Sequence, residues 1–303
     1  MVRYFVVFLI ACSAWAQLVR DVRSAIAEND FAKGERLIET YRKEKGVTPE
    51  MIFALSWLGR GAQAAKLWDK ADSYAAETRK LALEELKKRP LDAEQQLPLA
   101  LGASIEVQAH TMAARNARTE AVMFLDQELK RWRDTSIRTR IQKNKHLLSL
   151  EGKPAPPLEM NEYIGAKPVP VAQLKGKPLI LFFWAHWCAD CKYQGPILSR
   201  LQQEFGPRGL VVIGPTQRYG YIASGTDAPP ADELKYIAQI RDQFYGGLRM
   251  TVPVSEENFK NFGSSTTPTL VVVDRAGIVR LYHPGRMSYE ELLPIVTKAA
   301  GQS

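Results

Sequence analysis

Residues 179–192 read LILFFWAHWCADCK, and this stretch decides the fold of the second half of the chain. Its apolar beginning, 179–184, predicts a buried strand that stops one short turn before Cys188. Beyond Cys191, apolar residues recur at helical spacing through Phe205, so Cys188 is expected at a helix N-terminus. Free backbone N–H groups and the helix dipole stabilise a thiolate there. Two cysteines three residues apart on a first helical turn can close a disulfide and be attacked by an external thiol, which indicates redox chemistry.

Two plainer interpretations of the cysteine pair are a structural disulfide and a zinc site. Exported proteins carry structural disulfides, but a bridge that closes so small a loop constrains the unfolded chain little. A zinc site needs further ligands, and the sequence has no second Cys-x-x-Cys, while His186 and His283 stand alone. The sequence therefore predicts a redox pair that uses no metal and no cofactor.

Residues 152–300 resemble the thioredoxin superfamily, and in particular its TlpA/ResA-like branch, which is of the AhpC/TSA-redoxin type. The family frame is Trp-Cys-x-x-Cys-Lys/Arg with a proline five residues after the second cysteine, and Trp187, Lys192 and Pro196 occupy those places. A second family signature is a cis-proline that precedes a strand and faces the cysteines, and TTPTLVVV at 266–273 matches it. The resemblance implies an α/β thioredoxin fold with a central mixed sheet.

The resemblance also assigns roles to the residues of these motifs. Cys188 is the expected nucleophile, which attacks a substrate disulfide as a thiolate, and Cys191 then attacks Cys188 and releases the reduced substrate. Pro268 lacks a backbone donor and keeps its strand end open, while the backbone of Thr267 contacts the substrate chain. Trp187 is expected either to supply a flat apolar platform beside the nucleophile or simply to pack against its neighbours. The expected partners are a disulfide-bearing protein substrate and an upstream thiol reductant.

Two positions depart from the family pattern. Thioredoxins usually carry a buried acid where this chain has Phe182, and the ResA-like branch often has a glutamate where this chain has Gln194. Asp190 and His186 are the candidates to take over proton transfer at Cys191. Because a carboxylate beside a thiolate disfavours the charged form, Asp190 predicts a reducing pair that is nearer thioredoxin than DsbA in its potential.

Two other functions compete with disulfide reduction. A peroxiredoxin-like thiol peroxidase, an antioxidant protein, has the signature Pro-x-x-x-Thr/Ser-x-x-Cys, but Leu181 and Ala185 stand at its first two positions here. A helical-repeat adaptor whose thioredoxin domain only docks partners is the third reading, and the intact Cys-x-x-Cys and Thr-Pro argue against an inert domain. The expected function is therefore that of a thiol-disulfide oxidoreductase that reduces protein disulfides.

Residues 1–16 have the features of a secretory signal peptide. Arg3 supplies the positive charge, 4–11 the apolar core, and Ala-Trp-Ala at 14–16 the cleavage site. The apolar stretch is short for a membrane-spanning helix. The segment LIAC that ends at Cys12 is an alternative lipobox, which would anchor the chain through a lipid. The sequence predicts export to the periplasm or another extracytoplasmic space, and cleavage would leave only the active-site cysteine pair.

Residues 17–150 lack strand signals and carry helical periodicity. The apolar residues of 64–86 form one broad stripe, and KKRP at 87–90 ends that helix with favourable charges and a breaker. The segments 31–34 and 68–71 look like equivalent turns of successive helix pairs. They predict a degenerate tetratricopeptide-like domain, whose groove would take a protein partner, or else a plain antiparallel helical domain without a groove.

The segment EGKPAPP at 151–157 marks a domain boundary, because three prolines and a glycine cannot continue a helix. The sequence therefore predicts an all-α domain over 17–150 and a thioredoxin-like domain over 151–303. The net charge is +8, and basic residues gather over 130–145. Export argues against a nucleic-acid partner, so the cluster is interpreted first as a solvated helix face and second as a contact for an anionic membrane surface.

Overall fold

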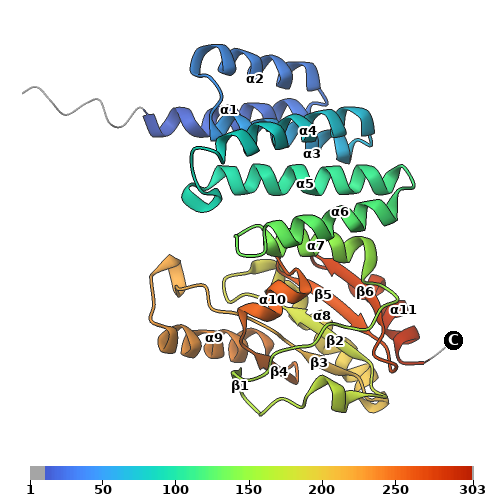
Figure 1. Cartoon of the computed structure of the whole chain (residues 1–303). Helices are drawn as coiled ribbons and strands as arrows, with labels where there is room; N and C mark the ends of the chain where they lie inside the picture. The colour runs from blue at the N-terminus through green and yellow to red at the C-terminus, as the bar shows by residue number, and fades with distance from the viewer. Residues whose placement is uncertain (1–10, 302–303) are drawn as a thin grey trace, which may run out of the picture. The chain divides into compact units, whose positions relative to one another are not determined.

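The computed structural model describes residues 11–301, which divide into two compact units between Ile141 and Gln142 (Figure 1). The first unit is all helical, and the second is built on a mixed sheet. Residues 1–10, which hold most of the expected signal segment, lie outside the described residues. Within the described part, no helix is long and apolar enough to cross a membrane.

The division between the units falls inside helix α7, which spans Arg138–Ser149. The second half of this helix packs against the sheet unit: the ring of His146 donates to the carbonyl oxygen of Asn261 at 2.9 Å and lies edge-on against Tyr282. The boundary expected at the proline-rich segment 151–157 follows just after this helix and stays a prediction.

Three helical hairpins make up most of the first unit. The α1/α2, α3/α4 and α5/α6 turns all place one residue in the left-handed region, at Asn29, Lys66 and Asn116. After each, a backbone N–H bonds back to the carbonyl five residues earlier, which closes the preceding helix in the same way. The equivalence of these turns supports a repeat-like organisation, while the tetratricopeptide-like identity stays a prediction. The helices are α1 Ala11–Ala27, α2 Phe31–Lys45, α3 Pro49–Ala64, α4 Trp68–Glu85, α5 Gln96–Ala114 and α6 Arg118–Arg131.

The stripe expected as one helix over 64–86 is interrupted. Helix α3 ends at Ala64, and α4 begins only at Trp68, because Lys66 takes a φ of 58° that no α-helix allows. Leu67 belongs to the turn and is 40% exposed. Helical periodicity of apolar residues carries on across so short a turn, which is why the pattern alone did not reveal the break.

The second unit contains a six-stranded sheet in the order β1-β4-β3-β2-β5-β6. Strands β2, β3 and β4 are parallel, while β5 runs antiparallel to β2 and β6 antiparallel to β5. This mixed sheet confirms the fold class expected from the sequence. The strands are β1 Tyr163–Ile164, β2 Leu179–Phe183, β3 Val211–Ile213, β4 Met250–Pro253, β5 Thr269–Val273 and β6 Val279–Pro284.

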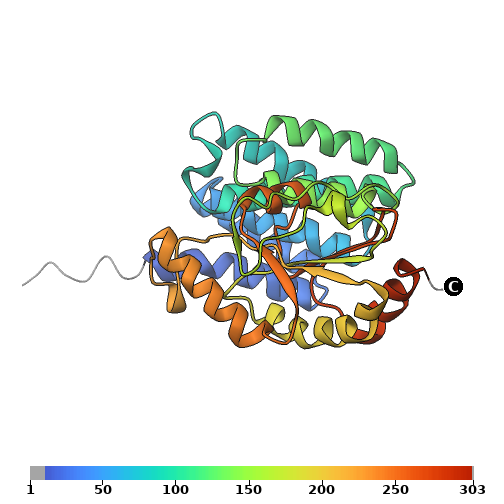
Figure 2. The ribbon, with the colours of Figure 1, turned by 90° about the horizontal axis from the view of Figure 1, so that it is seen from below.

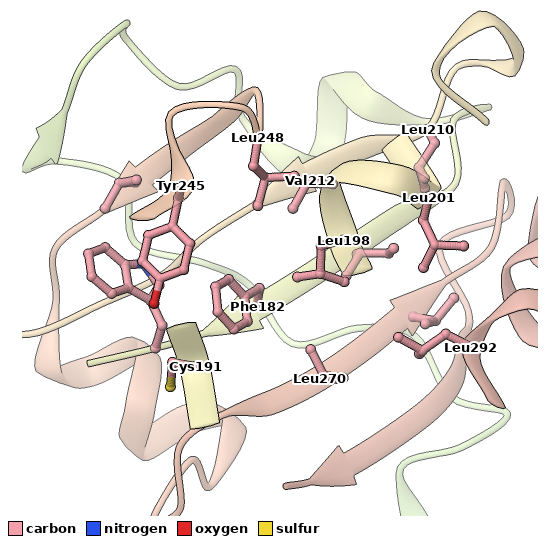
Figure 3. Close-up of a cluster of buried hydrophobic side chains, with 14 of the residues drawn as sticks. Phe182, Cys191, Leu198, Leu201, Leu210, Val212, Tyr245, Leu248, Leu270 and Leu292 are labelled. Atoms are coloured by element: carbon pink, nitrogen blue, oxygen red, sulfur yellow. The ribbon is translucent and has the colours of Figure 1, made fainter. Parts of the chain in front are cut away.

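Strand β2 is buried on both faces and divides the core into two clusters. Its even-numbered residues, with Phe182 foremost, pack with α8 (Ala189–Phe205), α9 (Pro230–Tyr245) and α11 (Tyr289–Ala299) on one side of the sheet (Figure 2). Figure 3 shows this cluster, in which Phe182 lies beside Tyr245 and Cys191 lies at one end. Its odd-numbered residues pack on the other face with α10 (Glu256–Phe262). The period of two along an extended strand produces this division.

His146 makes the stability of the second unit depend on pH. Burial lowers the pKa of its imidazole from 6.5 to about 4. Between these values the unfolded chain binds the proton and the folded chain does not, so the free energy of unfolding falls as the pH drops from 6.5 toward 4. The full effect is on the order of 3 kcal/mol. Burial also lowers the pKa of His186, which adds in the same direction.

Urea unfolding of the full chain at pH 7 and pH 5 tests this expectation. His146→Asn is expected to lower the free energy of unfolding at pH 7. Between pH 7 and pH 5, however, this free energy should fall less in the variant than in the unsubstituted protein. An acid sensitivity that is the same in both proteins would show that other groups carry the effect.

Candidate dithiol active site

Cys188 and Cys191 lie where the chain passes from β2 into α8. Cys188 is the N-cap of α8, and its Sγ accepts the backbone N–H of Cys191 at 3.1 Å. The two cysteines are disulfide-bonded, with their Cα atoms 5.2 Å apart. Cys191 is fully buried, whereas Cys188 is 4% exposed. A disulfide or thiol partner arriving from solvent therefore reaches Cys188 first, as expected of the nucleophile.

The turn before Cys188 is fixed by the end of β3. The side chain of Trp184 is fully buried and donates its indole N–H to the carbonyl of Gly214 at 2.9 Å. The hydroxyl of Thr216 donates to the carbonyl of Trp184 at 2.9 Å, and the N–H of Trp184 donates to the carbonyl of Pro215 at 3.1 Å. These hydrogen bonds hold Trp184, and with it the start of the turn that leads to the cysteines, against the residues that follow β3.

Pro268 lies at the start of β5, which pairs with β2. The register places Thr269 opposite Phe183, so the residues before β5 lie at the same end of the sheet as the turn that leads to Cys188. The Thr267–Pro268 peptide bond is cis, as the resemblance implies. The carbonyl of Pro268 accepts the N–H of Gly285 at 2.7 Å, and the buried hydroxyl of Thr267 has no partner among the described residues.

Trp187 is half exposed and packs its ring edge-on against Tyr219 at 5.4 Å. Lys192 lies over the ring of Phe244 at 4.3 Å. Trp187 therefore leaves a large apolar face in solvent directly before Cys188, which is itself nearly buried.

Asp190 points to the surface and pairs with Arg286 at 3.4 Å, and both side chains are more than half exposed. An exposed pair of this kind is screened by solvent and salt. Asp190→Asn is therefore expected to raise the reduction potential of the cysteine pair by less than about 30 mV, the shift for a tenfold change in the equilibrium constant. Equilibration with glutathione buffers measures this potential. A rise well above that limit, or a fall, would mean that the Asp190 charge acts on the thiolate directly.

Gln194, at the position of the branch's glutamate, is buried one turn beyond Cys191. Its carbonyl oxygen accepts the N–H of Met287 at 2.8 Å, and its amide nitrogen has no partner among the described residues. Phe182, at the position of the buried acid of thioredoxins, packs edge-on against Tyr245. Both residues that depart from the family pattern are therefore core residues, and neither supplies a group that could transfer a proton to or from Cys191.

The buried carboxylate that does lie beside this turn is Glu233, which the sequence reasoning missed. It is fully buried on α9 and takes a hydrogen bond from Nε2 of His186 at 3.3 Å. Burial lowers the pKa of His186, so its imidazole is neutral near pH 7. His186 was one of the two groups expected to replace the missing acid. No sequence signal distinguished Glu233 from its exposed neighbours in the same helical turn.

A family match falls within the second unit. Residues 152–218 match the model of the AhpC/TSA family. The chain is 26% identical over 130 residues to the thiol:disulfide interchange protein DsbE of Pseudomonas fluorescens biotype C, a match covering 43% of this chain but only 64% of that protein. It is also 26% identical over 143 residues to the thiol-disulfide oxidoreductase ResA of Bacillus thuringiensis (strain Al Hakam), covering 46% of this chain and 73% of that protein.

Among solved structures, a putative thiol:disulfide interchange protein DsbE from Chlorobium tepidum is 25% identical. The likeness covers 50% of this chain and 98% of that one, with a TM-score of 0.38.

Proposed function

We propose that this chain, whose second unit is a thioredoxin-fold domain of the AhpC/TSA family, is an exported thiol-disulfide oxidoreductase that reduces protein disulfides. The observation that carries the proposal is the position of the cysteine pair. An outer cysteine caps a helix and an inner one is fully buried, at the end of the sheet where Pro268 directly precedes the neighbouring strand. The relatives named as thiol-disulfide oxidoreductases support the same chemistry.

The reaction proceeds in two exchanges. The thiolate of Cys188 attacks one sulfur of the substrate disulfide, so that the substrate S–S bond breaks, a mixed disulfide forms and the departing thiolate takes up a proton. The thiolate of Cys191 then attacks Sγ of Cys188, which closes the intramolecular disulfide and releases the second substrate thiol. Two electrons pass from the protein to the substrate, and an upstream thiol reductant must restore the pair.

The N-terminal charge at Arg3, the apolar core and the Ala-Trp-Ala site support export to an extracytoplasmic compartment. The helical unit is proposed to bind a protein partner, while the basic residues of 130–145 are interpreted first as a solvated helix face and second as a contact for an anionic membrane surface.

A thiol peroxidase is the second candidate, since the matched family is named for such proteins. Ala185, three residues before Cys188, offers no hydroxyl where the peroxidase signature has one. The two functions are separated by measuring insulin reduction coupled to dithiothreitol and peroxide consumption on the same preparation. We expect insulin reduction without peroxide consumption. Peroxide consumption alone would favour the peroxidase, and neither activity would favour an adaptor.

A further inference from the structure

The Glu233 carboxylate ties together two segments of the candidate site. It lies in the first turn of α9 and accepts the backbone N–H groups of Tyr219 and Gly220, the latter at 2.9 Å. It also takes the hydrogen bond from the ring of His186, whose side chain is 1% exposed. A buried carboxylate costs folding energy unless donors satisfy it, and these three donors together with the helix N-terminus do so.

The donors come from different parts of the chain. His186 belongs to the turn that leads directly into Trp187 and Cys188, whereas Tyr219 and Gly220 belong to the loop between β3 and α9. At the base of that loop, Arg218 forms a bidentate pair with Glu162. The Glu233 carboxylate is thus the clasp between this loop and the turn before the nucleophile.

The clasp builds an aromatic wall, which consists of Trp187, Tyr219 and Tyr221. The ring of Tyr219 lies edge-on against both His186 at 5.5 Å and Trp187 at 5.4 Å, and Tyr221 lies against His186 at 5.4 Å. Tyr236 of α9 closes the remaining side of the imidazole at 5.3 Å. Edge-on aromatic contacts of this kind hold rings in fixed orientations.

Within residues 11–301, charged side chains also act on His186 and on Glu233. Lys192 acts on His186, and Arg218 acts on Glu233 and is itself paired with Glu162. Burial raises the pKa values of Tyr219 and Tyr221, so both phenols are neutral near pH 7. With a neutral imidazole, the Glu233–His186 contact is a hydrogen bond that orients two segments rather than an ion pair that stores charge.

We propose that Glu233 is a positioning residue for protein substrates: it fixes the aromatic wall on which an extended apolar or aromatic segment beside the substrate disulfide lies. The inference rests on the proposed function. Because Cys188 is only 4% exposed, a folded or bulky substrate must first settle on the rim, and the half-exposed Trp187 is the apolar surface available there. A small disulfide needs only the sulfur of Cys188 and does not need the wall.

The test compares two substrates in the full chain, insulin and hydroxyethyl disulfide. Glu233→Ala is expected to raise the KM for insulin about tenfold, as expected for the loss of one good contact surface, and to leave the rate with hydroxyethyl disulfide within about twofold. Glu233→Gln keeps a carbonyl acceptor for the loop N–H groups and should restore part of the insulin KM. Asp232→Asn removes a neighbouring exposed carboxylate from the same helical turn, so it should change neither the KM for insulin nor the rate with hydroxyethyl disulfide.

A second variant keeps the test decisive even if Glu233→Ala does not fold. Tyr219→Ala removes the centre of the wall but leaves the backbone N–H that Glu233 accepts, so it should reproduce the rise in KM for insulin alone. Equal losses with both substrates, or an unchanged KM for insulin in both variants, would overturn the proposal. If the unsubstituted protein reduced neither substrate, the proposed function itself would fail, which is a distinct result.

Discussion

Cys188→Ser is expected to lower insulin reduction by about a thousandfold or more, to the uncatalysed rate with the reductant alone. Cys188 is the sulfur that the fold leaves accessible, and serine in its place is not ionised and cannot form a mixed disulfide. Cys191→Ser removes only the second exchange, so it should attack substrate once and then stop. Dithiothreitol-coupled insulin turnover measures the first variant, and a single-turnover reaction of the pre-reduced protein without dithiothreitol measures the second.

Cys12→Ser is the matched control for these variants, since it alters the third cysteine of the sequence and should leave turnover unchanged. Alkylation of the reduced protein adds a structural check, because Cys188 should be labelled before the fully buried Cys191. Faster labelling of Cys191 would reverse the assignment of nucleophile and resolving cysteine.

Trp184→Ala is expected to lower the free energy of unfolding by about 3–5 kcal/mol, the usual cost of emptying a large aromatic site in a core. Trp184 is fully buried, lies against Tyr245 with ring centroids 5.0 Å apart, and donates to the carbonyl of Gly214. The substitution therefore leaves both a cavity and an unsatisfied buried acceptor. Urea unfolding of the full chain measures the loss.

Trp187→Ala provides the matched control, because the same residue type three positions later is half exposed. It should change stability by less than about 1 kcal/mol, since it forms no part of the buried core, and should instead weaken insulin binding. If the two tryptophan variants lost stability equally, the turn before Cys188 would not be anchored as described.

Much of the second unit was predictable because its signals are local. The apolar run of β2, the spacing of the cysteines and Pro268 before β5 each determine structure within a few residues. Ser288 and Glu291 form a capping box at the start of α11, and the Ser-x-x-Glu spacing behind it is visible in the sequence alone. These features need no knowledge of the rest of the chain, so a sequence pattern suffices to recognise them.

The features that escaped prediction depend on contacts between distant segments. Glu233 looks like any acidic residue near a helix N-terminus, and only the packing of α9 turns it toward His186 and the loop at Tyr219. Asp190 was expected to disfavour the thiolate, and its exposed position beside Arg286 depends on the segment that leads into α11. A single sequence carries no signal for either arrangement.

Trapping with Cys191→Ser tests whether Cys188 attacks protein disulfides. The reduced variant is incubated with insulin or an extracytoplasmic protein extract, and the adducts are mapped by mass spectrometry of non-reduced peptides. We expect a stable mixed disulfide that joins Cys188 to a cysteine of the substrate and is released by dithiothreitol. The absence of such an adduct, while the unsubstituted cysteine pair still cycles between disulfide and dithiol, would show that Cys188 is not the nucleophile of a protein disulfide reductase.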